Sequence, residues 1–171
     1  MTGHPPLLET IESRAARLAA YAEVDDLAEW SGWAPFDQAL PEVPRDPGVY
    51  LFREPHDAVV RYVGSAGERA GGGGRPQGLY GRLRVHRTGQ APVSGLGEAA
   101  LDRALGDVEW LAARLERLRT SGPERVRDWA RDAIVRLAPE VSWSAQPSAA
   151  DARVLEARVL QLLRPFDLWN R

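Results

Sequence analysis

Two short runs of strand-forming residues stand out in the first third of the chain. Gly48–Arg53 and Val59–Gly64 combine valine, tyrosine, leucine and phenylalanine, and the mostly polar residues 54–58 lie between them. Residues of this kind favour extended backbone, and two such runs joined by a short polar segment are typical of a β-hairpin. The pattern therefore predicts two antiparallel strands.

The length of the loop sets the expected register of this hairpin. With a loop of five residues, Arg53 pairs with Val59. Counting back along both strands then places Tyr50 directly opposite Tyr62, so that the two phenol groups share one face of the sheet. A slip of one residue would put the two tyrosines on different faces.

Apolar residues three and four positions apart predict helices outside the hairpin. The last helix has a start pattern in Ser148 and Asp151 and a stop at Pro165. Pro123 stands where the first residue of a helix is favoured. The predicted helices cover residues 6–21, 97–120, 123–137 and 148–164, and residues 141–145 alternate as a third strand does.

These elements predict an α+β fold, in which a small three-stranded antiparallel sheet packs against helices. Residues 44–171 contain the hairpin, the third strand and most of the helices. Residues 1–43 are expected to form a helical extension, because they are too few to bury a core of their own. Trp30 and Trp33 are the expected anchors of this extension, and the alternative is an arm that contacts DNA or a partner.

The amino-acid composition limits which class of protein this chain can belong to and which kinds of metal or catalytic site it can contain. The chain has 171 residues, of which 44% are hydrophobic and 27% charged, as in a soluble single domain. It shows no apolar run of membrane-spanning length and no signal-peptide pattern, so a cytoplasmic location is expected. The absence of cysteine excludes disulfides, thiolate nucleophiles and cysteine-bound zinc, and any metal must be held by oxygen or histidine.

Charge is unevenly distributed along the chain. The formal net charge is −2, but residues 61–90 hold six arginines and one acidic residue. Every basic residue is an arginine, whose guanidinium forks onto two phosphate oxygens. A basic segment within an acidic body is compatible with a confined DNA-binding groove.

Glu156 occupies an unusual place in the last helix. At about 100° per residue, it falls among the apolar positions of that helix, where it is the only charged side chain. A buried lone carboxylate is costly unless it meets a cation, a metal or a hydrogen-bonding network. Ion pairing with an arginine and metal ligation are the two interpretations.

The tripeptides Gly48-Val49-Tyr50 and Tyr62-Val63-Gly64 resemble the signature of the GIY-YIG nuclease family. The resemblance extends from about Pro44 to the end of the chain and implies the order β-β-α-α-α-β-α. It identifies residues 78–86 as a helix that carries the family's arginine at Arg82 and a histidine, His86, one turn later. Leu155-Glu156 and Arg164-Pro165 resemble the family's glutamate helix and its end.

The resemblance implies a metal-dependent DNA endonuclease of repair, restriction or defence. Glu156 would bind Mg²⁺ or Mn²⁺, and Arg82 would stabilise charge on the phosphate. Tyr50 or His86 would be the general base, and the pKa of about 6.5 for an unperturbed histidine suits that role. Tyr62 belongs to the expected catalytic set and would also position phosphate or water. The other expected substrate contacts are Gly64, Arg84, Arg87 and Asn170. Asn170 stands two residues beyond the place of the family's asparagine.

Two other functions stay open at this point. One is a nucleic-acid-binding module that keeps the fold without cleaving DNA. The other is an enzyme of the same fold that acts on a nucleotide or another small molecule, which the acidic body of the chain and its lack of lysine favour.

Overall fold

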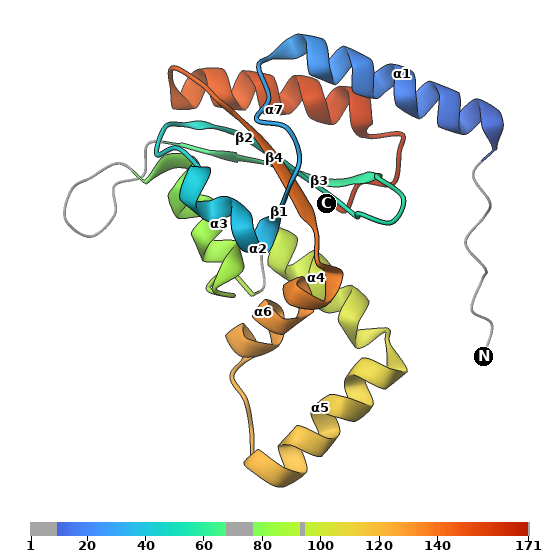
Figure 1. The fold of residues 1–171 in the computed structure, drawn as a ribbon, viewed down its shortest axis with the longest axis vertical. Coiled ribbons are helices and arrows are strands. Elements are labelled where there is room, and N and C mark those ends of the chain that lie inside the picture. The colour runs from blue at the N-terminus through green and yellow to red at the C-terminus, as the bar shows by residue number, and fades with distance from the viewer. Residues whose placement is uncertain (1–9, 68–76, 93–94, 171) are drawn as a thin grey trace.

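The computed structural model describes residues 10–67, 77–92 and 95–170. These residues form an α+β structure with one antiparallel sheet and helices on both of its faces (Figure 1). None of their helices combines the length and apolar character needed to span a membrane. The elements are α1 (Ile11–Leu27), β1 (Ala34–Pro35), α2 (Phe36–Ala39), a 3-10 helix (Leu40–Glu42), β2 (Gly48–Arg53), β3 (Val60–Ala66), α3 (Gly78–Arg87), α4 (Leu96–Leu105), α5 (Val108–Ser121), α6 (Val126–Leu137), β4 (Glu140–Ala145) and α7 (Ala149–Leu163).

The sheet has four strands in the order β1-β4-β2-β3, and every neighbouring pair is antiparallel. The prediction of three strands is therefore wrong in number, although the hairpin and the third strand are confirmed. The missed strand, β1, has two residues, Ala34 and Pro35, which pair with Val141 and Glu140 of β4. So short a strand, ending in proline, leaves no alternating pattern to detect.

The hairpin register differs from the predicted one. Tyr50 lies opposite Gly64, and Tyr62 lies opposite Phe52. Arg53 pairs with Val60, so the strands contain a bulge in which Arg61 is the extra residue. The Tyr50–Tyr62 pairing is thus wrong by two residues, but a shift of two preserves the face, and both tyrosines lie on the same side of the sheet.

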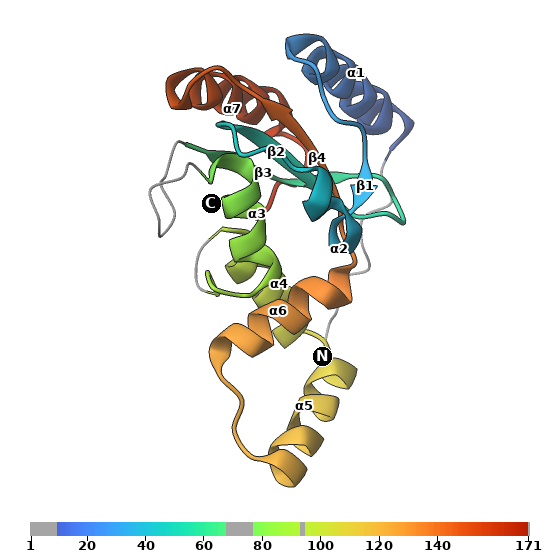
Figure 2. The ribbon, with the colours of Figure 1, turned by 60° about the vertical axis from the view of Figure 1, so that its left-hand side comes forward.

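Helices lie on both faces of the sheet (Figure 2). A hydrophobic core is buried on each face. The face that carries Tyr50, Phe52 and Tyr62 packs against α2, α3, α4 and α6, and the opposite face packs against α1 and α7. This alternation along β2 and β3 is what a sheet buried on both faces requires. The catalytic candidates on the hairpin therefore lie on the face of the sheet that packs against α3.

The predicted helix 97–120 is two helices, α4 and α5. Gly106 ends α4, and the carboxylate of Asp107 then accepts hydrogen bonds from the backbone N–H groups of Glu109 and Trp110, which begins α5. Helix α6 likewise begins at Val126 and not at Pro123. The observed order therefore has four helices between the hairpin and β4, where three were predicted.

Helix α1 begins after the N-cap Thr10 and extends six residues beyond the predicted end, Tyr21. It packs on α7. Trp30 and Trp33 are half-buried in the core that α1 and α7 share, as expected of anchors. The part of the predicted helix before residue 10 lies outside the described ranges, and the division at residue 43 stays a prediction.

Candidate active site

A hydrogen-bonded cluster of three side chains forms where β2 meets α3. Arg82 and His86 are four residues apart on α3, which places them on one side of that helix. Nε of Arg82 donates to the Tyr50 hydroxyl oxygen over 3.3 Å, and Nε2 of His86 lies 2.9 Å from the same oxygen. The predicted alignment of Arg82 and His86 is therefore confirmed, and Tyr50 is the group on which they converge.

His86 is almost fully enclosed, with 1% of its surface exposed. Burial, and then the charge of Arg82, lower the pKa of His86 to about 3. The imidazole is therefore neutral near pH 7. The ordinary pKa near 6.5, on which the expected general-base role of His86 rested, does not apply, because burial removes the hydration of the charged ring.

The surroundings of His86 also indicate its tautomer. Within the described residues Nδ1 is buried and has no hydrogen-bond partner. A proton on Nδ1 would leave a buried N–H unpaired, which is costly. The favoured tautomer therefore carries its proton on Nε2 and donates it to Tyr50.

The two tyrosines are stacked, with ring centroids 6.3 Å apart. Burial, and then the neighbouring Tyr62, raise the pKa of Tyr50 far above its usual range, while Arg82 opposes the shift. Burial also raises the pKa of Tyr62, against the opposing effects of Arg82 and of a hydrogen bond from Tyr50. Both phenols are therefore neutral at physiological pH.

Two glycines make room for these rings. A Cβ on Gly64 would overlap the Tyr50 hydroxyl group, and a Cβ on Gly95 would overlap that of Tyr62. The absence of a side chain at Gly64 lets Tyr50 cross the neighbouring strand, and the predicted contact of Gly64 with substrate stays a prediction. Gly95 was missed by the sequence analysis, because it lies far from both tripeptides along the chain.

Glu156 reaches the same region from α7. Its Oε2 accepts a hydrogen bond of 2.6 Å from the hydroxyl of Ser65, the residue after the second tripeptide. Its charge acts on both Tyr50 and Tyr62. The side chain is half-buried and not fully buried as the helical pattern suggested, and in the described part of the chain it forms no ion pair with an arginine.

The surroundings of Glu156 fit a hard divalent cation better than they fit a structural ion pair. A carboxylate that is partly exposed, anchored by one hydroxyl and free of arginine can bind Mg²⁺ or Mn²⁺ with water completing the shell. Within the described ranges, the one group of three side chains able to bind a metal together lies away from Glu156, in the hairpin loop. It consists of Glu54, His56 and Asp57. Arg61 already forms ion pairs of 2.6 Å with Glu54 and 2.7 Å with Asp57.

The predicted basic segment is divided between two roles. Arg61 is mostly buried and also pairs with Asp167, so its charge is neutralised within the fold. Arg84 and Arg87 are exposed on α3, with no acidic partner among the residues described. Arg69 and Arg75 lie outside the described ranges. The candidate phosphate contacts that remain are therefore on α3.

Asn170 pairs with the free edge of β3. Its side-chain amide donates to the Val63 carbonyl over 2.7 Å, and its Oδ1 accepts from the Val63 N–H over 2.9 Å. The backbone N–H of Trp169 also donates a hydrogen bond to the backbone carbonyl of Arg61. The amide of Asn170 thus closes the exposed strand edge, and its predicted contact with substrate stays a prediction.

A pocket of about 150 Å³ opens beside Tyr62. Tyr62 is 7% exposed and lines this pocket, whereas Tyr50 and His86 are enclosed. Its lining residues are Tyr62, Gly95, Glu98, Ala99, Trp169 and Asn170.

Comparison with known proteins returned no match: no family model, curated protein or solved structure is similar to this chain. The site therefore stands on its own geometry and on the resemblance of its motifs.

Proposed function

We propose that this protein is a metal-dependent endonuclease of the GIY-YIG type that hydrolyses phosphodiester bonds in DNA. One observation carries the proposal: Tyr50, Tyr62, Arg82, His86 and Glu156, from five places in the chain, interact around one hairpin. A purely structural cluster would pair the carboxylate with the arginine. Here Arg82 instead contacts phenols, and Glu156 contacts Ser65.

Arg82 supplies a fixed positive charge. Burial acts to lower its pKa, but the two tyrosines outweigh this effect and the pKa of Arg82 is raised. Its guanidinium is held by the hydroxyls of Tyr50 and Tyr62, and we assign its positive charge to neutralising oxygens of the scissile phosphate. Exposed Arg84 and Arg87 would hold flanking phosphates of the backbone.

Glu156 would hold the divalent ion, with Ser65 fixing the orientation of its carboxylate. When bound, Mg²⁺ or Mn²⁺ supplies positive charge for the phosphate and lowers the pKa of coordinated water. His86 and Tyr50 do not titrate near pH 7, so their task is to orient Tyr62. Tyr62 lines the pocket and is the phenol that we assign to contact substrate or water.

Cleavage of supercoiled plasmid tests this function. Wild type is expected to nick DNA with Mg²⁺ or Mn²⁺ and to lose this activity in EDTA. Arg82→Ala should lower cleavage by about 10²-fold or more while changing DNA binding far less, because the charge acts mainly in the transition state. Arg158→Ala, on the exposed side of α7, is the matched control and should cleave normally.

Three results would reject the proposal. Full cleavage in EDTA would exclude the metal-dependent mechanism. Binding of duplex DNA in a gel shift, without cleavage under any divalent metal, would favour the module that binds without cutting. Failure to bind DNA at all would favour an enzyme that acts on a nucleotide or another small molecule.

A further inference from the structure

The pocket beside Tyr62 has the size of a single ring. Its volume is about 150 Å³. A protein cavity of about that volume binds one molecule of benzene, so a six-membered ring fits within it. Glu98 and Ala99 reach the pocket from the first turn of α4, and Trp169 and Asn170 reach it from the segment after α7.

Two aromatic side chains line this pocket and are held in place by the protein. Tyr62 stacks on Tyr50, with ring centroids 6.3 Å apart. The guanidinium of Arg103 lies 3.9 Å from the centroid of the Trp169 ring, and its Nη1 donates to the Ala99 carbonyl over 3.1 Å. A flat ligand therefore meets aromatic surface that needs no further ordering when the ligand binds.

Glu98 gives the pocket its chemical preference. Among the described residues that line the pocket, it is the only charged one. A carboxylate accepts hydrogen bonds at about four positions and repels phosphate. The amide of Asn170 is already paired with the backbone of Val63. The ligand group that suits the pocket is therefore a neutral ring that donates hydrogen bonds.

A metal ion is the other partner that a carboxylate attracts. Within the described ranges, the one group of three side chains able to bind a metal together lies in the hairpin loop, and Glu98 does not belong to it. The pocket supplies a single carboxylate beside two aromatic rings. These surroundings favour a flat organic ring over a metal ion.

We propose that this pocket binds a cytosine base, taken from an unpaired position of a DNA strand next to the scissile phosphate. The inference rests on the proposed nuclease function, which brings DNA to Tyr62. Cytosine has one ring, and its exocyclic N4 amino group donates to a carboxylate such as that of Glu98. Tyr62 and Trp169 offer the aromatic surface on which unpaired bases stack.

The same features discriminate against the other bases. Thymine presents its O4 acceptor where cytosine presents the N4 donor, and a carboxylate repels that acceptor. Adenine also carries an amino group, but its two fused rings exceed the space for one ring. The structure therefore assigns to Glu98 the choice between cytosine and thymine.

DNA with a single unpaired base tests the proposal. Moving a base out of the stack costs least when that base is already unpaired. Fluorescence anisotropy in EDTA measures the affinity of labelled duplexes that carry one bulged cytosine, thymine or adenine. Wild type should bind the cytosine bulge about tenfold or more tightly than the thymine bulge. The adenine bulge should bind as weakly as the thymine bulge.

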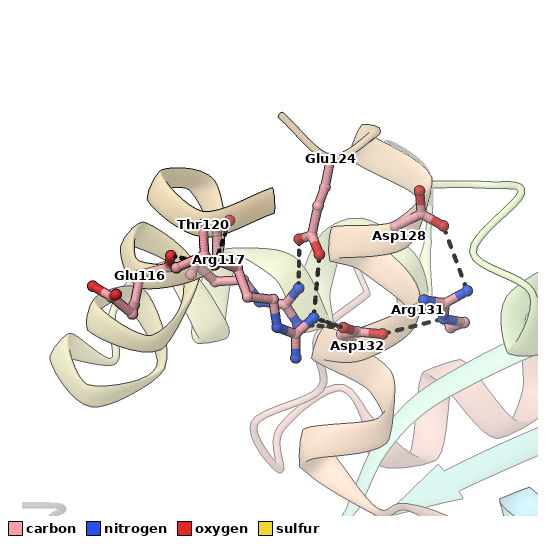
Figure 3. A network of polar contacts seen from close by, with 8 residues as sticks. Glu116, Arg117, Thr120, Glu124, Asp128, Arg131 and Asp132 are labelled. Atoms are coloured by element: carbon pink, nitrogen blue, oxygen red, sulfur yellow. Dashed lines mark hydrogen bonds and ion pairs between the residues drawn. The ribbon is translucent and has the colours of Figure 1, made fainter. Parts of the chain in front are cut away.

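Glu98→Gln should reduce the preference for cytosine over thymine to about twofold or less, because an amide both donates and accepts hydrogen bonds. Loss of a negative charge strengthens binding of every DNA, so the ratio of the affinities is the readout. Glu116→Gln is the matched control, because this carboxylate of α5 is 65% exposed and lies outside the ion pairs drawn between α5 and α6 in Figure 3. Thermal melts establish folding, and Glu98→Ala provides a second variant.

Competition with free cytidine monophosphate identifies the source of the base. The free nucleotide should displace labelled DNA only at millimolar concentrations, because it lacks the phosphate contacts along the strand. Displacement at micromolar concentrations would assign the pocket to a free nucleotide and overturn the DNA source.

Equal affinity of wild type for the cytosine and thymine bulges would overturn the proposal, as would a folded Glu98→Gln variant that keeps the full preference. Plasmid cleavage without a preference for cytosine would reject the base pocket and leave the nuclease function standing. A preference for cytosine without cleavage under Mg²⁺ or Mn²⁺ would do the reverse. Failure to bind any of the three duplexes would reject both.

Discussion

The Tyr50 hydroxyl and Nε2 of His86 lie 2.9 Å apart in a fully enclosed part of the site. Tyr50 comes from the centre of the sheet and His86 from the third turn of α3, so this contact fixes the helix against the strand. It also couples two groups that would titrate in water, and burial keeps both of them neutral at physiological pH. Their common role is orientation, and this has measurable consequences.

Acid stability should depend on His86. Its pKa is about 3 in the folded protein and about 6.5 in the unfolded chain, so between these values the unfolded chain binds the additional proton. The contribution of His86 to stability is complete above pH 6.5 and falls by up to about 1.4 kcal/mol per pH unit as the pH drops toward 3. Chemical denaturation of His86→Phe should show a shallower pH dependence than wild type. His56→Phe, at an exposed histidine, is the control, and equal slopes for wild type and His86→Phe would show that His86 is not buried as a neutral ring.

Gly64 should tolerate no side chain. An added Cβ would overlap Tyr50, whose ring is enclosed on every side, so Gly64→Ala should destabilise the protein by about 1–3 kcal/mol or more and displace the Tyr50 hydroxyl. Urea denaturation measures the first effect and plasmid cleavage the second. Gly106→Ala adds the same methyl group where the nearest atom is 3.4 Å away and should change little. A Gly64→Ala variant as stable and active as wild type would contradict the observed register.

Removal of the Glu156 charge should leave the apoprotein intact. Ser65 can donate to the side-chain oxygen of glutamine as it does to the carboxylate, and no described arginine would lose a partner. In EDTA, the free energy of unfolding of Glu156→Gln should therefore lie within about 1 kcal/mol of that of wild type. Added Mn²⁺ should raise the melting temperature of wild type but not that of the variant. A large loss of stability in EDTA would identify Glu156 as a structural residue.

Arg61 and Arg87 should separate stability from DNA binding. Arg61 is mostly buried and pairs with three carboxylates, of which Asp167 is exposed and contributes little. Arg61→Met should therefore lower the free energy of unfolding by about 1–3 kcal/mol. Arg87 is exposed without an acidic partner among the described residues, so Arg87→Met should leave stability unchanged and weaken DNA binding. Denaturation curves and gel shifts on both variants check this division. Reversed effects would place the DNA contact on the hairpin loop.

Local interactions were sufficient to determine much of the fold. The alternation in β2 and β3, the cap at Ser148 and the apolar positions of α7 depend on residues a few positions apart, and each was predictable from sequence. The shared face of Tyr50 and Tyr62 follows from the same period of two. The resemblance of the motifs likewise selected Tyr50, Arg82 and His86, which are hydrogen-bonded to one another.

Only the tertiary structure decided the environment of those residues. The bulge at Arg61, the two-residue strand β1 and the pairing of Asn170 with Val63 depend on segments far apart in the chain. The same holds for the low pKa of His86 and for the choice of Ser65 as the partner of Glu156. Sequence patterns encode which face a side chain occupies, but desolvation and hydrogen-bond partners arise only when distant elements pack together, because both depend on what displaces water around a group.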